Sequence, residues 1–301
     1  MTLHWIKFAV SAGGLALLLW WTDAPGVLAR LQGVDHTWTL LALLSVTAAT
    51  FAMASRWMIV ARAFDIHIPF LAALREYYLA QLINLALPGG VAGDVTRAVR
   101  ARQAADLKRA AQSVMAERLL GQIVIMGFML LGFVGAVVLP GGLNWGGLGW
   151  FVPGLLVVSV IGALAIAKTD TATARFVRMT GDMTRQPVML VHGAVTTFCL
   201  IFGFYACARA TGVVLPVEAW ATLIPLVLTA MLIPLSIGGW GWREGAAAAL
   251  FPLIGAPASA GVATGITYGL VLVAATLPAA VFLLLPGFSS TLSTKGKADI
   301  S

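Results

Sequence analysis

Six apolar stretches, each long enough for one membrane-spanning helix, limit what this chain can fold into. About 20 apolar residues in a helix cross the hydrocarbon core of a bilayer. With 60% apolar and only 10% charged residues, the chain cannot hide its apolar side chains in one soluble core. It is therefore predicted to be an all-α polytopic membrane protein, with spans at about 6–21, 38–61, 113–139, 145–167, 188–208 and 259–285.

The charge distribution favours a membrane protein over a nucleic-acid-binding one. The formal net charge is +7, yet the lysines and arginines lie mostly in short connections between the apolar stretches. Such clustering is typical of the positive-inside rule, by which basic loops stay in the cytoplasm. The expected partners are therefore membrane lipids, anionic or phosphate-bearing, and no nucleic acid.

No pattern in the sequence indicates a metal or cofactor site. Cys199 and Cys207 are eight residues apart in one apolar stretch, and a helix would separate them by about 12 Å, too far for a disulfide. The histidines are scattered, and no HExxH, CxxC or acidic cluster with metal-ligand spacing occurs. We predict no metal, no cofactor and no catalytic residue.

Two interruptions of apolar runs stand out from the rest of the sequence. Residues 87–97 (LPGGVAGDVTR) end the run 71–87, and residues 233–244 (IPLSIGGWGWRE) end the run 220–237. Irregular backbone at membrane depth is tolerated only where protein or a water-filled cavity satisfies its polar groups. Each motif therefore predicts a break beside a polar cavity, and Gln81 and Asn84 give the first run a polar face as well.

The basic residues also indicate how the two interrupted runs meet the membrane. Arginines precede and follow the run 71–87, so both of its sides are expected in the cytoplasm. We predict a re-entrant hairpin that turns at residues 88–93, and a second one that opens from the outside at the other motif. The chain then has six full spans plus two re-entrant helical hairpins, eight or more membrane helices, with both termini in the cytoplasm. Eight full crossings are the rival topology.

The two halves of this arrangement repeat each other with reversed direction. Each reads helix, helix, hairpin, helix, which is an inverted-topology repeat, the plan of many secondary transporters. We predict a single transmembrane domain over residues 1–288, with repeat A at about 1–140 and repeat B at about 145–288. Residues 289–301 are small and polar, and are predicted to form a disordered cytoplasmic tail.

The hairpin tips are the predicted binding site for an anion. The first turn of each second arm offers unpaired N–H groups and the positive end of a helix dipole, and an arginine there adds a forked donor set. A phosphate-bearing head group fits such a two-sided site. The candidate substrate-binding residues are Gly90, Gly93, Asp94, Arg97, Glu117, Arg118, Ser236, Gly239, Gly241, Arg243 and Glu244.

Structural roles compete for some of these residues. Asp94 could cap the second arm of the first hairpin, or form a local ion pair with Arg97 at i, i+3. Glu117 and Arg118 are a charged pair at the start of a span. They could neutralise each other, support the first hairpin or line the pathway.

These motifs resemble the flippase-like membrane family typified by the transmembrane part of lysylphosphatidylglycerol synthase, which also includes standalone members without the synthase domain. The resemblance covers about residues 6–286 and rests on Pro88, Gly90, Gly93, Asp94, Arg97, Glu117, Arg118, Gly121, Pro234, Ser236, Gly239, Gly241, Arg243 and Glu244. It implies a multi-pass protein of the bacterial cytoplasmic (inner) membrane that moves lipids between leaflets. Because these 301 residues hold no polar stretch for aminoacyl transfer, the resemblance does not assign aminoacylated phosphatidylglycerol as the lipid.

Three functions remain as hypotheses. The leading one is a flippase or transporter, not an enzyme, that moves an anionic, glyco- or polyprenyl-linked lipid with its head group between the two hairpin tips. The alternative is an accessory subunit of a lipid or envelope biosynthesis complex, with biosynthetic enzymes or a second copy of the chain as partner. Its interface could be Gly261, Gly265 and Gly269, although close helix packing explains this spacing as well. An intramembrane lipid-modifying enzyme is least favoured, because no Ser-His-Asp spacing or acidic metal cluster is found.

Overall fold

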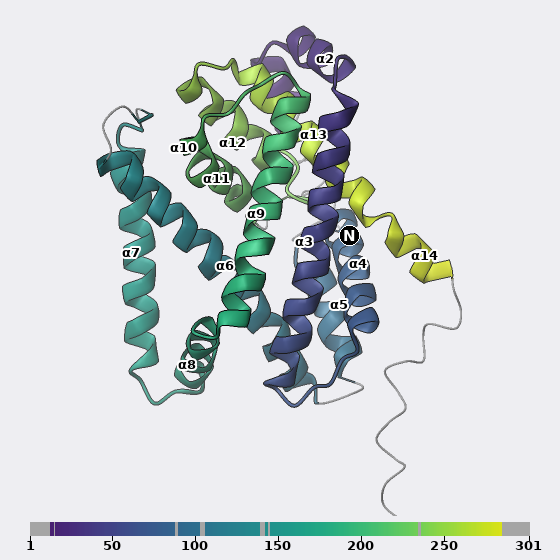
Figure 1. Cartoon of the computed structure of the whole chain (residues 1–301), viewed down its shortest axis with the longest axis vertical. Coiled ribbons are helices and arrows are strands. Elements are labelled where there is room, and N and C mark those ends of the chain that lie inside the picture. The colour runs from purple at the N-terminus through teal and green to yellow at the C-terminus, as the bar shows by residue number, and fades with distance from the viewer. Residues whose placement is uncertain are drawn as a thin grey trace, which may run out of the picture.

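The computed structural model describes residues 13–14, 16–87, 90–102, 106–138, 142–143, 145–233 and 236–284. Over these ranges every regular element is a helix (Figure 1), so the all-α class is confirmed. The predicted tail at 289–301 and the motif residues Pro88, Gly89, Pro234 and Leu235 lie outside the described residues.

Five helices are long and apolar enough to cross a membrane, which makes the chain a multi-pass membrane protein. They are α3 (His36–Arg62), α6 (Leu107–Val138), α7 (Leu148–Ala167), α9 (Pro187–Ala210) and α13 (Ala258–Thr276), the last continued by α14 (Pro278–Leu284). These are five of the six predicted spans. Of the sixth, at 6–21, the structure describes only residues 13–14 and 16–21, which are helical.

The remaining helices are shorter and lie between the spans. They are α2 (Ala24–Gln32), α4 (Phe70–Ala86), α5 (Ala92–Ala101), α8 (Ala172–Thr184), α10 (Val217–Ala221), α11 (Leu223–Ala230), α12 (Trp242–Leu250) and the 3₁₀ turn η1 (Phe251–Ile254).

Helices α4 and α5 form a helical hairpin at the first motif. The chain leaves α4 in an extended conformation at Leu87 and turns through Gly90, whose φ of 64° is left-handed and suits glycine. The arms run antiparallel, because Asn84 Oδ1 accepts from the Gly93 N–H at 2.7 Å near the tip. Towards the base, Arg100 of α5 lies 3.5 Å from Glu76 of α4.

A second hairpin forms at the other motif, with α10 and α11 as its first arm and α12 as its second. The run 220–237 is not one helix, because α10 ends before Thr222 and α11 begins after it. Pro225 explains this break, since proline has no N–H to donate to the carbonyl of residue 221. The turn into α12 passes through Gly238, Gly239 and Gly241, which all have positive φ.

The two hairpins lie in opposite halves of the molecule. Helices α3 and α9 run side by side through its middle, with α4 and α5 in the lower half of Figure 1 and α10, α11 and α12 in the upper half. The tips meet, because a Cβ on Gly238 would lie 3.0 Å from Leu85 Cδ2 and 3.3 Å from Leu85 Cα.

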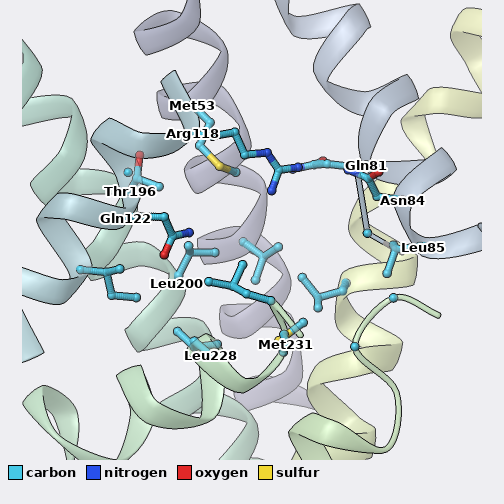
Figure 2. A pocket seen from close by; sticks show the side chains of 18 of the residues that line it. Met53, Gln81, Asn84, Leu85, Arg118, Gln122, Thr196, Leu200, Leu228 and Met231 are labelled. Atoms are coloured by element: carbon cyan, nitrogen blue, oxygen red, sulfur yellow. The ribbon is translucent and has the colours of Figure 1, made fainter. Parts of the chain in front are cut away.

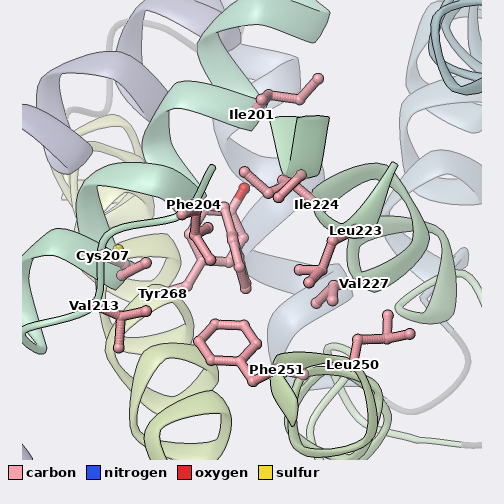
Figure 3. Packing of buried hydrophobic residues seen from close by; sticks show 14 of the residues in the cluster. Ile201, Phe204, Cys207, Val213, Leu223, Ile224, Val227, Leu250, Phe251 and Tyr268 are labelled. Atoms are coloured by element: carbon pink, nitrogen blue, oxygen red, sulfur yellow. The ribbon is translucent and has the colours of Figure 1, made fainter. Parts of the chain in front are cut away.

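The upper half is packed around aromatic and aliphatic side chains from four elements. Figure 3 shows Phe204 of α9 and Tyr268 of α13 beside Leu223 of α11 and Phe251 of η1. The Phe204 and Tyr268 ring centroids are 5.4 Å apart in an edge-to-face arrangement. This cluster fixes the second hairpin against the two spans that flank it.

The glycine stripe of α13 is used inside the chain. A Cβ on Gly261 would meet the backbone of α12, and one on Gly265 would lie 3.1 Å from Glu244 Cα. One on Gly269 would meet the Arg243 guanidinium. The stripe therefore lets α12 and its charged pair approach α13 closely, which confirms the packing interpretation.

Candidate functional site

A cavity of about 350 Å³ lies between the two hairpin tips, within the size range of small-molecule sites. Both tips contribute to its wall, through Gly90 and Val91 on one side and Ser236, Gly238 and Gly239 on the other. The rest of the lining comes from helices α3, α4, α6, α9, α11 and α13 and from residues 231–233, which follow α11. The cavity is therefore formed where the two halves of the chain meet.

The charged side chains of the cavity wall come from α3 and α6, whereas the second hairpin contributes mostly apolar side chains. In Figure 2 the Arg118 side chain extends from α6 toward Gln81 and Asn84 of the first hairpin. Leu228 and Met231 of the second hairpin line the opposite side. A molecule with one charged end and one apolar end matches this division.

Arg118 is the exposed cation of the cavity wall, which also includes the buried Arg56. The Arg118 side chain is 40% exposed and pairs with Asp94, which also accepts from Asn84 Nδ2 at 3.4 Å. A guanidinium presents five N–H donors, so one carboxylate does not use all of them. Arg118 therefore keeps donor capacity toward the cavity.

Behind Arg118 lies a buried network of arginines and carboxylates from three helices. Glu117 Oε1 accepts from Arg56 Nη2 at 2.6 Å, and its Oε2 accepts from Arg97 Nη2 at 3.1 Å. Arg97 also lies 3.4 Å from Asp94. With Arg118 included, three guanidinium groups face two carboxylates, which leaves one positive charge in excess on the cavity side.

Aromatic rings fix the central arginine of this network. The guanidinium carbon of Arg97 lies 4.6 Å from the ring centroid of Trp57 and 4.3 Å from that of Tyr77. These are cation–π distances, and the Arg97 side chain is only 1% exposed. Arg97 thus joins the first hairpin to α3 and α6.

The second hairpin carries a smaller and balanced arrangement. Arg243 Nε donates to Glu244 Oε1 at 2.9 Å, and both side chains are fully buried. Glu244 Oε2 accepts from the Gly241 N–H at 2.6 Å, and the Arg243 guanidinium lies 4.7 Å from the Trp240 ring centroid. The pair is neutral as a unit and stabilises the turn into α12.

The structure divides the predicted site residues into two groups. The cavity is lined by Gly90, Glu117, Arg118, Ser236 and Gly239. The others surround it without lining it, and these are Gly93, Asp94, Arg97, Gly241, Arg243 and Glu244.

The local alternatives for the charged residues can now be decided. The i, i+3 ion pair of Asp94 and Arg97 is confirmed. The capping role of Asp94 is wrong, because α5 has no side-chain cap and Asn84 receives the Gly93 amide instead. Mutual neutralisation of Glu117 and Arg118 is also wrong, since Glu117 pairs with Arg97 and Arg118 pairs with Asp94, both on α5 of the first hairpin. Both residues line the cavity as well.

Some cavity residues were not among the candidates. Arg56 is a charge inside the apolar stretch 38–61, and an ionisable residue within a span was the signal that could have identified it. Gln122, Thr196 and Thr197 also line the cavity, but single polar residues in apolar helices gave no comparable signal. Within the described ranges, no three His, Cys, Asp or Glu side chains group together as a metal would require.

Comparisons with known proteins identify the family of this chain. The family described as the lysylphosphatidylglycerol synthase TM region matches residues 4–280 of this chain. A UPF0104 membrane protein of Pyrococcus horikoshii is 23% identical over 125 residues, which cover 40% of this chain and 37% of that relative. No solved structure matches the chain.

Proposed function

The chain belongs to the lysylphosphatidylglycerol synthase TM region family, and from this premise we propose that it moves an anionic phospholipid between membrane leaflets. The phosphate-bearing head group lies in the cavity between the hairpin tips, and the acyl or prenyl chains stay in the bilayer. The protein acts as a flippase or transporter and carries out no chemical conversion of the lipid.

The exposed guanidinium of Arg118 is the observation that carries this proposal. It reaches a cavity at the meeting point of the two halves, and Asp94 is the carboxylate partner that an arginine at membrane depth needs. The network behind it has one positive charge in excess, which a phosphate would balance. A planar guanidinium also matches the geometry of phosphate oxygens.

Neutral polar groups extend the proposed head-group site across the cavity. Ser236 Oγ and Gln122 Oε1 are buried cavity atoms without a hydrogen-bond partner in the protein. Buried polar atoms normally have a partner, so groups of this kind favour a polar ligand beside them. In this proposal Arg97, Arg243 and Glu244 hold the two tips in place instead of touching the lipid.

The membrane arrangement belongs to the same proposal. The two hairpins enter from opposite faces, the halves form an inverted-topology repeat over 1–140 and 145–288, and both termini face the cytoplasm of a bacterial inner membrane. The opposite placement of the hairpins in Figure 1 supports this reading. Rocking of one half against the other would open the cavity to each leaflet in turn.

Lipid movement in proteoliposomes tests the proposal. The full-length protein is reconstituted with a trace of fluorescent phosphatidylglycerol, and movement is followed by extraction of outer-leaflet lipid with albumin. We expect Arg118→Gln to slow movement by at least tenfold, because the cavity loses its exposed cation. Arg118→Lys should retain part of the rate, since lysine keeps the positive charge but lacks the forked N–H donors of the guanidinium.

A matched control separates the cavity from surface charge. Arg109 is another half-exposed arginine paired with carboxylates, but it lies outside the cavity. Arg109→Gln should leave the rate within twofold of the parent. Equal rates for the parent, Arg118→Gln and protein-free vesicles would reject the proposed function.

A further inference from the structure

A second hollow lies on the other side of the α6–α9 contact from the cavity. This groove has a volume of about 320 Å³ and is lined by α6, the end of α8 and the start of α9. Its wall is apolar apart from Thr184, and Ile123, Phe128 and Leu190 in it are 39–50% exposed. The groove is therefore open to the surroundings of the helices, which for a multi-pass protein are lipid.

One close contact separates the groove from the cavity. On α6, Gly121 and Gln122 face the cavity, while Val124 faces the groove. On α9, Thr196 lines the cavity, and one turn earlier Gly193 packs against Val124. A Cβ on residue 193 would lie only 2.6 Å from Val124 Cγ2, so the two helices touch through this glycine.

An arginine lies at the α8 end of the groove, and another lies near the start of α8. Arg185 directly follows Thr184 and is highly exposed, with Asp182 at 3.5 Å. Arg175 also lies on the exposed side of α8. An amphipathic helix with such a face binds anionic lipid head groups at a membrane surface.

From these features we infer that the groove holds an acyl chain of an anionic phospholipid that is about to enter the cavity. The contact of Val124 with Gly193 is the lateral gate between the two hollows. This inference rests on the proposed function and adds the route by which the lipid reaches it. The head group waits near Arg185, the chain lies in the groove, and separation of α6 from α9 admits the head group to Arg118.

A reversible cross-link tests the gate. The ideal Cβ of residue 193 lies 3.3 Å from Val124 Cβ, near the separation of about 3.5–4.5 Å in a disulfide. The full-length protein carries Val124→Cys and Gly193→Cys, with Cys199→Ala and Cys207→Ala to remove the native thiols. We expect oxidation to slow phosphatidylglycerol movement at least tenfold, and dithiothreitol to restore it within twofold of the protein lacking all cysteines.

Complete cross-linking with an unchanged rate would overturn the gate while leaving the proposed function intact. If the reduced variant is slow as well, Leu190→Trp decides, because it fills the groove and leaves Val124 and Gly193 themselves unchanged. It should slow movement at least threefold. Leu164→Trp on the lipid-facing side of α7 serves as the control, and equal rates for the two variants would also overturn the inference.

Occupancy of the groove has a readout that does not depend on transport. Phosphatidylglycerol with a photoreactive acyl chain should label peptides containing residues 123–128 and 189–190. Leu190→Trp should lower that labelling at least threefold, and Leu164→Trp should not. Equal labelling in all three proteins would reject the acyl chain as occupant, whereas labelling without lipid movement would reject only the proposed function.

Discussion

Each of the two hairpins buries an arginine near the start of its second arm, but the two arginines are paired with carboxylates in different ways. In the first hairpin, Arg97 shares Glu117 with Arg56, so three helices are joined and Arg118 is left facing the cavity. In the second, Arg243 pairs with the adjacent Glu244, and nothing remains unbalanced. In the proposed function, the first tip therefore receives the anion, and the second tip supplies a wall without excess charge.

Removal of the shared carboxylate should have the largest effect. Glu117→Gln leaves Arg56 and Arg97 buried without their common partner, and loss of one member of a buried ion pair lowers stability by about 3–5 kcal/mol. Thermal unfolding of the detergent-solubilised protein measures this. The control is Asp182→Asn, which disrupts an exposed pair with Arg185 and should leave the unfolding temperature unchanged.

In the second hairpin, removing both charges of the ion pair should restore part of the stability that each single removal costs, and a double-mutant cycle measures this. Arg243→Met and Glu244→Gln each leave one partner uncompensated, but together they remove both charges. We therefore expect the double variant to be more stable than the sum of the single losses, by about 1–3 kcal/mol. The same cycle with Arg97→Met and Glu117→Gln should recover less stability in the double variant, because Arg56 stays unpaired. Equal coupling in both hairpins would contradict the distinction drawn between them.

Substitutions of two glycines at the tips can distinguish the cost of backbone strain from the cost of disturbing the contact between the hairpins. Gly90 and Gly238 both have left-handed φ, and an alanine there is disfavoured by about 1–2 kcal/mol. Gly90 has open space around its Cβ direction, whereas Gly238 packs on Leu85. Gly238→Ala should therefore lower the unfolding temperature more than Gly90→Ala. The reverse order would show that the tips do not rely on this contact.

Asp94→Asn should have the smallest effect of these substitutions. It should change the affinity for lipid and not the stability of the protein. The Asp94 carboxylate competes with any anion for Arg118, while Arg97 still keeps Glu117. We expect the affinity for phosphatidylglycerol to rise by about twofold to fivefold, which corresponds to less than 1 kcal/mol. A titration followed by native mass spectrometry measures it. Weaker binding would mean that Asp94 positions Arg118 and does not compete with the lipid.

The spans could be predicted because apolar stretches of membrane length are visible in a sequence without any partner. The start of α6 could not be located in the same way. The helix begins at Leu107, six residues before the apolar stretch, because polar residues such as Lys108 and Arg109 continue it beyond that stretch. Hydropathy detects apolar stretches but not helical residues outside them.

The motifs predicted where the chain breaks, but not which charges meet. Glu117 pairs with Arg56, which is 61 residues away, and no local pattern encodes that distance. The sequence placed Arg97 and Arg118 equally in the candidate site, whereas burial makes one a support and leaves the other facing the cavity. The assignment of Arg118 to lipid binding stays a prediction.

The proposed head-group site can be examined in a structure of the protein in lipid nanodiscs that contain phosphatidylglycerol. We expect density for a phosphate within hydrogen-bond distance of Arg118, between the tips marked by Gly90 and Gly238. Head-group density confined to surface arginines such as Arg175, with none beside Arg118, would contradict it.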